Sequence, residues 1–361
     1  MKYQYWLARL DGIGNVTKRK LLKYFQSAKT IYETDKAGYQ KSGHMREGIA
    51  EYVEKQKELW ELSDEYEAFL EQGISFTTME RSDYPRQLLE VYNAPYALYY
   101  KGKLPAQEES VSIVGARRCS AYGRVYAEEL AFALAREGIS VASGMALGVD
   151  AAAHNGSIRG QGTTYAFLGC GVDVVYPRSH RKLYQQIIEH GAVISEYAPG
   201  TPPLAEHFPT RNRLIAGISE KTVVIEARRR SGSLITADLA MEQGKDVFAL
   251  PGRVSDPMSE GTNHLIAQGA GIIESVEEFV ACIKDLSNYH RIPDDENALK
   301  NLNLEKEELM VYSCLDFYAK GLEEVMQDTG LELLTALSAA MRLMELGLIQ
   351  ENFKNQYIRL R

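Results

Sequence analysis

The sequence predicts an α/β protein with an open, doubly wound, mostly parallel sheet, preceded by a helical region and followed by a small domain. Between Val111 and about Ile283, apolar strands alternate regularly with helical stretches long enough for right-handed crossovers. Residues 1 to about 80 have helical periodicity without strand signals. The length of 361 residues suits two or three domains.

The N-terminal region contains segments with apolar side chains at i, i+3 and i+4. The predicted helices are Tyr5–Leu10, Lys18–Phe25, Ile49–Leu62 and Ser63–Gln72. The segment Asp11–Asn15 (DGIGN) joins the first two helices, and Lys18, Arg19 and Lys20 follow it. This predicts a helix–hairpin–helix element whose glycines admit a phosphate to the backbone N–H groups. The alternative is a plain helix–helix turn capped by Gly12 and Gly14.

The strands of the sheet are apolar and β-branched. A Tyr-rich, Pro-punctuated stretch, 81–105, leads into them. The predicted strands are Val111–Val114, Ile139–Ser143, Thr163–Leu168, Ala192–Glu196, Thr222–Glu226, Val247–Leu250 and Gly271–Glu274.

The C-terminal part begins after a polar, Pro-bearing stretch, His290–Asn301, which predicts a linker. The helices Leu304–Tyr318, Gly321–Thr329 and Leu331–Leu346, followed by the hairpin Gly347–Leu360, outline a winged-helix-like domain. The expected division is therefore a helical domain at 1–80, the sheet domain at 81–288, a linker at 289–300 and a winged-helix-like domain at 301–361.

Composition narrows the class of protein. A net charge of −8 argues against general adhesion to nucleic acid but does not exclude a local basic groove. The first thirty-one residues are basic and the last sixty are acidic on balance, so only parts of the chain suit a polyanion. The sequence has no apolar run of transmembrane length, and the start lacks the apolar stretch of a signal peptide. Four dispersed cysteines suggest reduced thiols in a cytoplasm and do not predict a metal site.

Five segments end a strand in a glycine-bearing or basic loop that opens a helix. They are Val111–Gly123, Val141–His154, Thr163–His180, His207–Ser219 and Val223–Ala237. A parallel sheet places such loops along one edge, where helix N-termini favour anions. That edge is predicted to bind phosphate.

The first loop, GARRCSAYG, follows the strand Val111–Val114. Gly115 allows an anion to approach the backbone closely, and the Arg117 guanidinium can form a bidentate contact with a phosphate. The Ser120 hydroxyl can donate a hydrogen bond at the start of the helix. The alternative is an ion pair on a solvated rim.

The second loop is poor in side chains. Ser143, Gly144 and Gly148 suit backbone approach to an anion. Asp150 is expected to cap the following helix, and His154 to be a packed, hydrogen-bonded histidine.

The remaining loops add more cations. In the third, Arg178 is expected at the same edge, and Tyr176 can stack on a base. In the fourth, Arg211, Asn212 and Arg213 either clamp a phosphodiester or brace neighbouring loops. The fifth combines three arginines, 228–230, with the hydroxyls and backbone of Ser231, Gly232 and Ser233.

Several signatures of catalysis and cofactor binding are missing from the sequence. The glycine pattern and ribose-binding acid of a dinucleotide site are absent, as is a Walker A motif, so no cofactor is expected. No metal-ligand cluster or nucleophile elbow emerges. The acid–base candidates, each with a structural alternative, are Asp150, His154, Glu196, Glu226 and Asp238.

An ordered set of motifs resembles the DNA-processing protein A (DprA, or Smf) family over roughly residues 80–285. They are V-G-A-R…S-A-Y-G, S-G-M-A-L-G-V-D…A-H, L-G-C-G-V-D-V-V-Y-P, R-N-R-L-I-A-G-I-S, V-I-E-A…S-G-S-L-I-T-A and A-L-P-G…S-E-G-T-N. The family commonly has a helical N-terminal domain, here helix–hairpin–helix or SAM-like, and often a winged-helix-like C-terminal one. The resemblance implies an extended Rossmann-like domain that forms homodimers.

The resemblance also implies a function. Members bind single-stranded DNA, protect incoming strands during natural transformation, hand them to the RecA recombinase and help displace single-strand-binding protein, with no established enzymatic activity. By motif, Arg117 and Arg178 resemble the main basic DNA contacts, with Ser143–Gly148 and Arg211–Arg213 as walls of the same pocket. This sequence departs from the family pattern at Ala116, where a hydroxyl residue is usual, and at His180, where Asn is usual. The acidic C-terminal domain suits a protein partner or dimer modulation better than DNA.

Two alternatives use the same pocket. One is an enzyme similar to the phosphoribohydrolases that cleave nucleoside monophosphates, but their P-G-G-x-G-T-x-x-E signature is replaced here by 230–238, RSGSLITAD. The other is a sensor of a small nucleotide.

Overall fold

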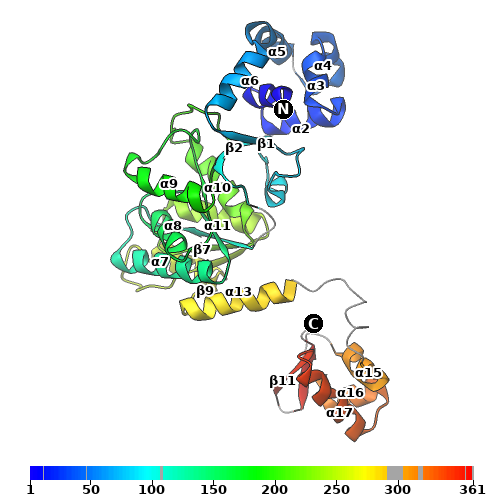
Figure 1. The fold of residues 1–361 in the computed structure, drawn as a ribbon. Coiled ribbons are helices and arrows are strands. Elements are labelled where there is room, and N and C mark those ends of the chain that lie inside the picture. Colours follow the sequence, from blue (N-terminus) through cyan, green and yellow to red (C-terminus); the bar gives the residue numbers. More distant parts are fainter. Residues whose placement is uncertain are drawn as a thin grey trace. The chain divides into compact units, whose positions relative to one another are not determined.

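The computed structural model describes residues 1–10, 12–45, 47–105, 109–290, 304–315, 320–353 and 355–359. They form two compact units, Met1–Val280 and Ala281–Arg361 (Figure 1). Within the described ranges, no helix combines the length and the apolar character that a bilayer crossing requires.

The first unit is built on a nine-stranded sheet in the order β1-β2-β6-β5-β4-β3-β7-β8-β9. The strands are β1 Ser75–Thr78, β2 Ala97–Gly102, β3 Ser110–Val114, β4 Ser140–Ser143, β5 Thr164–Phe167, β6 Ala192–Ser195, β7 Lys221–Val224, β8 Asp246–Ala249 and β9 Gly271–Ile272. Strands β3 to β9 are mutually parallel and confirm the seven predicted strands. The predicted doubly wound sheet is therefore correct.

Strands β1 and β2 were not predicted. They pair with each other and add to β6 in antiparallel register. β1 is only four residues long and follows soon after α6, and β2 lies in the Tyr-rich, Pro-punctuated stretch that leads into the predicted sheet. Short strands carry too few alternations to reveal a period of two.

The chain reverses direction in the sheet next to β3. From β3 it moves outward through β4, β5 and β6, and it then returns to the other side of β3 to form β7, β8 and β9. The switch point of the doubly wound sheet thus lies between β3 and β7, where a crevice outside the carboxyl ends of the strands is expected.

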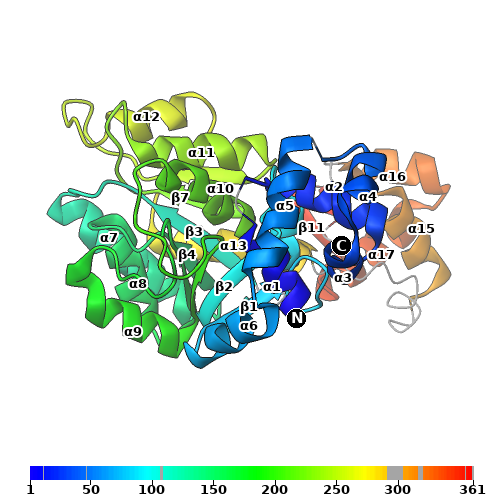
Figure 2. The same cartoon turned by 90° about the horizontal axis from the view of Figure 1, so that it is seen from above.

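Helices cover both faces of the sheet (Figure 2). One layer contains α7 Ala121–Arg136, α8 Val149–Arg159 and α9 Arg181–His190. The other contains α10 His207–Ile218, α11 Gly232–Glu242 and α12 Glu260–Ala267. Helix α13, Val276–His290, follows the last strand.

In the described residues before Ser75, six helices precede the sheet. They are α1 Lys2–Arg9, α2 Asn15–Phe25, α3 Ala28–Glu33, α4 Lys36–Ser42, α5 Glu47–Leu59 and α6 Leu62–Glu71. The short helices α3 and α4 were not predicted. In the predicted hairpin, Asp11 lies outside the described residues, and Gly14 stands at the N-terminus of α2.

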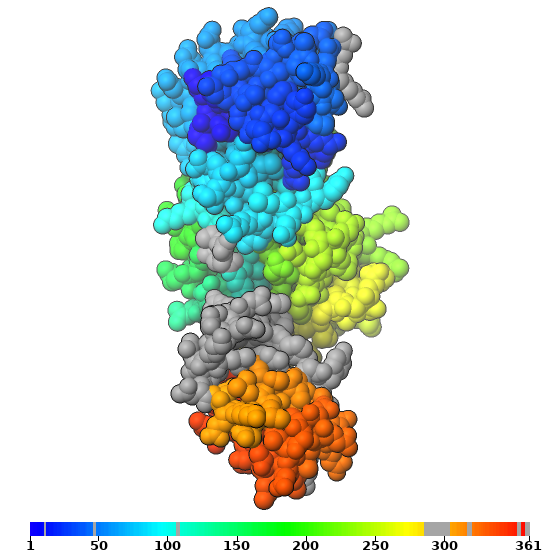
Figure 3. Space-filling view, turned by 90° about the vertical axis from the view of Figure 1, so that its right-hand side faces the viewer, coloured from blue at the N-terminus to red at the C-terminus, as the bar shows by residue number. Residues whose placement is uncertain are grey.

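The N-terminal helices share a core with the sheet. The Tyr5 ring stacks on Phe69 of α6 at 4.5 Å between centroids, and it meets Phe76 of β1 and Tyr99 of β2 edge-on. In space-filling view the helices (blue) lie directly on the segment of the first strands (cyan; Figure 3). The two parts therefore belong to one compact unit, and the boundary at residue 80 stays a prediction.

The second unit contains α15 Lys306–Cys314, α16 Leu322–Thr329 and α17 Leu333–Glu345, with the strands β10 Lys320–Gly321, β11 Ile349–Phe353 and β12 Gln356–Arg359. The strands form an antiparallel sheet in the order β10-β12-β11. The second unit has its own hydrophobic core, in which Val325, Ala336 and Leu343 are fully buried. The three helices and the hairpin agree with the sequence, whereas the winged-helix identity stays a prediction. Of the predicted linker, His290 ends α13 and 291–301 lie outside the described residues.

Candidate functional site

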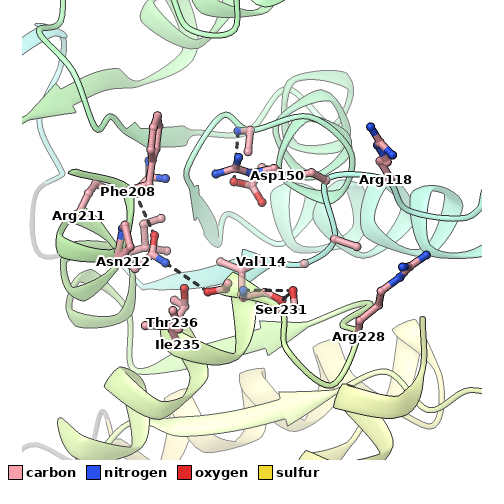
Figure 4. A pocket seen from close by; sticks show the side chains of 18 of the residues that line it. Val114, Arg118, Asp150, Phe208, Arg211, Asn212, Arg228, Ser231, Ile235 and Thr236 are labelled. Atoms are coloured by element: carbon pink, nitrogen blue, oxygen red, sulfur yellow. Dashed lines mark hydrogen bonds between the residues drawn. The ribbon is translucent and has the colours of Figure 1, made fainter. Parts of the chain in front are cut away.

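A cleft of about 670 Å³ opens at the switch point. Its walls are the loop after β3, the first turns of α10, and the loop that joins β7 to α11. Figure 4 shows Phe208, Arg211 and Asn212 on one wall, with Arg118 and Arg228 across from them. Of the predicted site residues, the cleft brings together Gly115, Arg117, Arg211, Asn212, Ser231, Gly232 and Ser233.

The lining of the cleft is strongly cationic. The exposed side chains of Arg117, Arg118, Arg228 and Arg230 surround the opening, and among the described residues that line it Asp150 is the single acid. Asp150 is itself buried. The cleft therefore presents positive charge in a chain with a net charge of −8, which does not exclude a local basic groove.

An aromatic platform lies between these cations. The ring of Phe208 is 5.4 Å from that of Tyr176, and the Arg117 guanidinium lies 5.4 Å from the Phe208 centroid. Arg211 approaches the same ring at 5.9 Å. Such a ring can stack on an unpaired base while the guanidiniums hold its phosphates. Phe208 was not singled out from the sequence, although an aromatic residue at a helix start beside basic loops could have drawn attention.

Arg211 is a buried brace. Its Nη1 donates to the carbonyl oxygens of Gly144, at 3.1 Å, and of Phe167. Burial lowers its pKa to about 10, and the charge of Asp150 opposes that shift. Of the two roles left open for Arg211, its contacts show the bracing of neighbouring loops.

Asp150 closes the second loop. Its carboxylate accepts the backbone N–H groups of Gly144, at 3.2 Å, and Ala146, at 3.3 Å. Burial raises the pKa of Asp150, while Arg211 and the two N–H groups lower it. The expectation that Asp150 caps α8 is wrong, because it turns back to the preceding loop.

Arg213 points away from the cleft lining. It forms a bidentate ion pair with Glu196, at 2.6 and 2.7 Å, and also donates to the carbonyl oxygens of Asn93 and Thr210. Both charged side chains are nearly buried. Arg213 therefore joins α10 to the end of β6 and to the segment before β2.

Ser120 is engaged by a carboxylate of the protein. It caps α7 by accepting the Gly123 N–H, and its Oγ and N–H donate to Glu226 at 2.5 and 2.8 Å. Glu226 is buried at the end of β7. The N-terminus of α7, the phosphate position of a dinucleotide fold, is thus occupied by an internal anion.

The glycines of the first two loops allow the loops to pack together. A Cβ on Gly144 would lie 2.7 Å from Arg211, and one on Gly115 would lie 2.7 Å from Val149. Gly148 has a φ of +80°, and its Cβ would lie 2.3 Å from the Ala116 oxygen. Their predicted role in anion approach stays a prediction, and packing alone already requires a glycine at each position.

The predicted residues of the second and third loops are spread out. Ser143 is buried and donates to the carbonyl oxygen of Ile113 at 2.6 Å. Arg178, in the short 3₁₀ helix η2 (Arg178–His180), is exposed but does not line the cleft. His180, where the resemblance led us to expect Asn, bonds through Nδ1 to the Met145 carbonyl at 3.1 Å and so joins the two loops.

The fifth loop opens α11 toward the cleft. Ser231 caps the helix by accepting the Ser233 N–H, and their hydroxyl oxygens lie 2.8 Å apart. Asn212 donates to the Gly232 carbonyl at 3.4 Å, which ties α10 to this turn. The sequence correctly placed these residues around one opening.

His154 is a core residue, as expected. Its Nδ1 lies 2.7 Å from the Thr164 hydroxyl, and burial lowers its pKa to about 3. Glu196, Glu226 and Asp150 are also paired within the protein, so four of the five acid–base candidates have structural partners.

Comparison with known proteins gives a consistent result. The model of the family described as DNA recombination-mediator protein A matches residues 75–284. The chain is 42% identical over 221 residues to a protein named DNA processing protein DprA from Streptococcus pneumoniae, covering 61% of this chain and 76% of that protein.

Two solved structures are similar in fold. The DprA structure from Streptococcus pneumoniae superposes with a TM-score of 0.67 at 35% identity, covering 78% of this chain and 97% of that one. A DprA structure from Helicobacter pylori, described for its single-stranded DNA binding mode, has a TM-score of 0.53 at 31% identity and covers 58% and 95%.

Proposed function

Because the chain belongs to the DNA recombination-mediator protein A family, we propose that it binds single-stranded DNA in the cleft at the switch point and delivers the strand to a RecA recombinase. The observation that carries the proposal is a ring of exposed arginines around the Phe208 platform. Guanidiniums bind phosphates without reading sequence, and stacking tolerates every base.

The phosphates bind on the α11 side of the switch point. At α7 a phosphate would have to displace Glu226 from Ser120. At α11 the helix begins in the cleft, and Arg228 and Arg230 lie beside it. The strand therefore runs between Arg117 on one wall and the turn Ser231–Ser233 on the other.

The platform selects unpaired bases. Phe208 lines a recess, so that only a base turned out of a duplex can lie against its ring. The bases of a flexible single strand are already unpaired, so placing one on the Phe208 ring does not require base pairs to be broken. A duplex presents only its phosphates to the cleft.

The protein acts by binding, not by catalysis. Near the cleft, Asp150 is held by backbone N–H groups, Glu226 by Ser120, and Glu196 by Arg213. A general base must reach a proton of its substrate, whereas these carboxylates are buried or nearly buried and are oriented by donors of the protein itself. In the wider proposal, the protein acts as a homodimer in the cytoplasm, protects incoming strands in natural transformation, and displaces single-strand-binding protein as RecA loads.

Calorimetry with three ligands tests the binding step. We expect a dT20 oligonucleotide to bind more tightly than a 20-base-pair duplex, and thymidine monophosphate to bind far more weakly than either. Equal affinity for the mononucleotide and dT20 would contradict the proposal and favour a nucleotide sensor. Release of free base from a nucleoside monophosphate would instead favour a phosphoribohydrolase.

A second assay tests delivery to RecA. On single strands coated with single-strand-binding protein, we expect the protein to shorten the lag of RecA's DNA-dependent ATP hydrolysis. Arg117→Ala should restore the lag, whereas Arg136→Ala, an exposed arginine at the far end of α7, should not. A lag that the wild-type protein leaves unchanged would contradict the delivery step but not the binding step.

A further inference from the structure

The basic side chains of α2 lie on two different faces of the helix. Lys18 is buried and donates to the Ala8 carbonyl at 2.8 Å, so it joins α2 to α1. Arg19, Lys20 and Lys23 are exposed, and Val16 and Tyr24 share their face at 48% and 47% exposure. Positions 16, 19, 20, 23 and 24 follow the helical repeat and form one continuous surface, which we call the α2 basic face.

The α2 basic face is not neutralised by the protein. Helix α2 contains no acidic residue in its first turn. In the described part of the chain, none of Arg19, Lys20 and Lys23 forms an ion pair with a carboxylate, in contrast to Lys36 and Lys57 of the same helical region. Three unpaired cations beside an exposed aromatic ring are the combination that binds single-stranded nucleic acid elsewhere.

The sheet places this face along the same edge as the cleft. Asn15, at the start of α2, accepts the Tyr96 N–H at 3.1 Å, immediately before β2. Because β2 runs antiparallel to β6, the start of β2 lies beside the carboxyl end of β6. The Tyr84 hydroxyl gives a second marker: burial raises its pKa, Glu196 raises it further, and Arg213 and Arg19 lower it. Arg19 and the Arg213–Glu196 pair therefore both act electrostatically on the Tyr84 hydroxyl.

The distance along the edge fits a short stretch of strand. From β3 the order runs through β4, β5 and β6 to β2. Four strand spacings span about 20 Å, which is about six nucleotides at stacked spacing. The exposed Arg178 belongs to the loop after β5 and so lies on this route. The route therefore includes a predicted DNA contact that does not line the cleft.

We propose that the α2 basic face is a second contact surface for single-stranded DNA, which binds the strand after it leaves the cleft past the loops of β5 and β6. The proposal rests on the proposed function of the cleft. It assigns the phosphates of the outgoing strand to Arg19, Lys20 and Lys23 and one of its bases to Tyr24.

A length series of oligonucleotides tests the proposal by fluorescence anisotropy. With dT6, which is too short to occupy the cleft and also span the route of about six nucleotides to α2, the triple variant Arg19→Ala/Lys20→Ala/Lys23→Ala should bind like the wild type. With dT18, the wild type should gain affinity, and the variant should bind roughly tenfold or more weakly. Its log–log salt slope should be flatter by about 2, from 0.7 for each of three lost contacts.

A charge-matched control separates local contact from net charge. Lys55, Lys103 and Arg136 are exposed bases away from the cleft lining, and their triple alanine variant should bind dT18 like the wild type. Thermal unfolding should show both triple variants folded. Equal dT18 affinity of the α2 variant and the wild type would overturn the proposal, as would an equal loss in both triple variants. If instead the cleft does not bind DNA, the Arg117→Ala variant should bind dT6 with the affinity of the wild type.

Discussion

The basic residues of this protein fall into two groups that the sequence does not distinguish. Arg211, Arg213 and Lys18 are buried and bind carbonyl oxygens or a carboxylate. Arg19 directly follows Lys18, and Arg117 and Arg118 belong to a basic loop as Arg211 and Arg213 belong to a basic helix start, yet these three side chains face solvent. A buried cation without a partner is destabilising, so the first group is fixed by the fold, whereas the second remains available for an external polyanion.

The comparison separates stability from binding. Removal of a buried basic side chain should lower the free energy of unfolding and should affect DNA binding only through the shape of the cleft. Removal of an exposed basic side chain should weaken DNA binding and leave the free energy of unfolding nearly unchanged. Each of the following changes tests one side of this division.

The largest effect is expected from Arg213→Met. The change leaves Glu196 nearly buried without its bidentate partner, which costs about 3–5 kcal/mol of unfolding free energy. Urea denaturation followed by circular dichroism measures it. The double variant Arg213→Met/Glu196→Met should recover much of the loss, and the folded fraction of each should still bind dT20. Full stability in the single variant would contradict the assignment of a structural pair.

Arg211→Met should have a smaller, pH-dependent effect. Arg211 lowers the pKa of Asp150, which burial raises, so its removal raises that pKa further. A group whose pKa is raised in the folded state contributes stability at pH values below its pKa in the unfolded state. That contribution is lost as the pH rises through its pKa in the folded state. The variant's deficit should therefore grow with pH, by at most about 1.4 kcal/mol per unit.

The second variant Arg211→Met/Asp150→Asn isolates the cause. It removes the titrating carboxyl, so the additional dependence on pH between 4.5 and 8 that Arg211→Met introduces should disappear. A deficit of Arg211→Met that shrinks as the pH rises would contradict the linkage to Asp150.

Arg117→Ala tests the exposed group. It should weaken dT20 binding about tenfold, equivalent to 1.4 kcal/mol, and flatten the salt slope by about 0.7, because one phosphate contact is lost. Unfolding free energy should change by no more than about 0.5 kcal/mol. Arg136→Ala serves as the control and should alter neither quantity. A large loss of stability in Arg117→Ala would place this residue with the buried group.

Ser120→Ala should have the smallest effect. The hydroxyl caps α7 and donates to Glu226, so its loss should cost about 1 kcal/mol of unfolding free energy. Because Glu226 already occupies this helix end, dT20 affinity should remain that of the wild type. Weaker DNA binding at unchanged stability would instead favour the predicted phosphate contact of Ser120.

Much of the candidate site could be predicted because it follows from strand order. Alternating strands and helices determine a parallel sheet, and a parallel sheet brings its loops to one edge. Gly115, Arg117 and Ser231–Ser233 could therefore be assigned to one opening without coordinates. The apolar, β-branched character of β3 to β9 is local, so these seven strands could be predicted from their own residues.

The remaining features depend on contacts between distant segments. Phe208 becomes a platform only because Tyr176 and Arg117, from two other loops, lie beside it. The capping role expected for Asp150 failed because its partners belong to a loop that folds back, which local helix propensity does not register. Glu226 fills the N-terminus of α7 across 106 residues of sequence.

The sequence by itself determined the fold class, the family resemblance and the edge at which cations gather, because hydrophobic periodicity and loop composition are read residue by residue. The tertiary structure alone decided which of those cations are buried braces and which remain exposed. The reason is physical: the free energy of a charge depends on its burial and its partners, and both are set by chain segments that are neighbours only after folding.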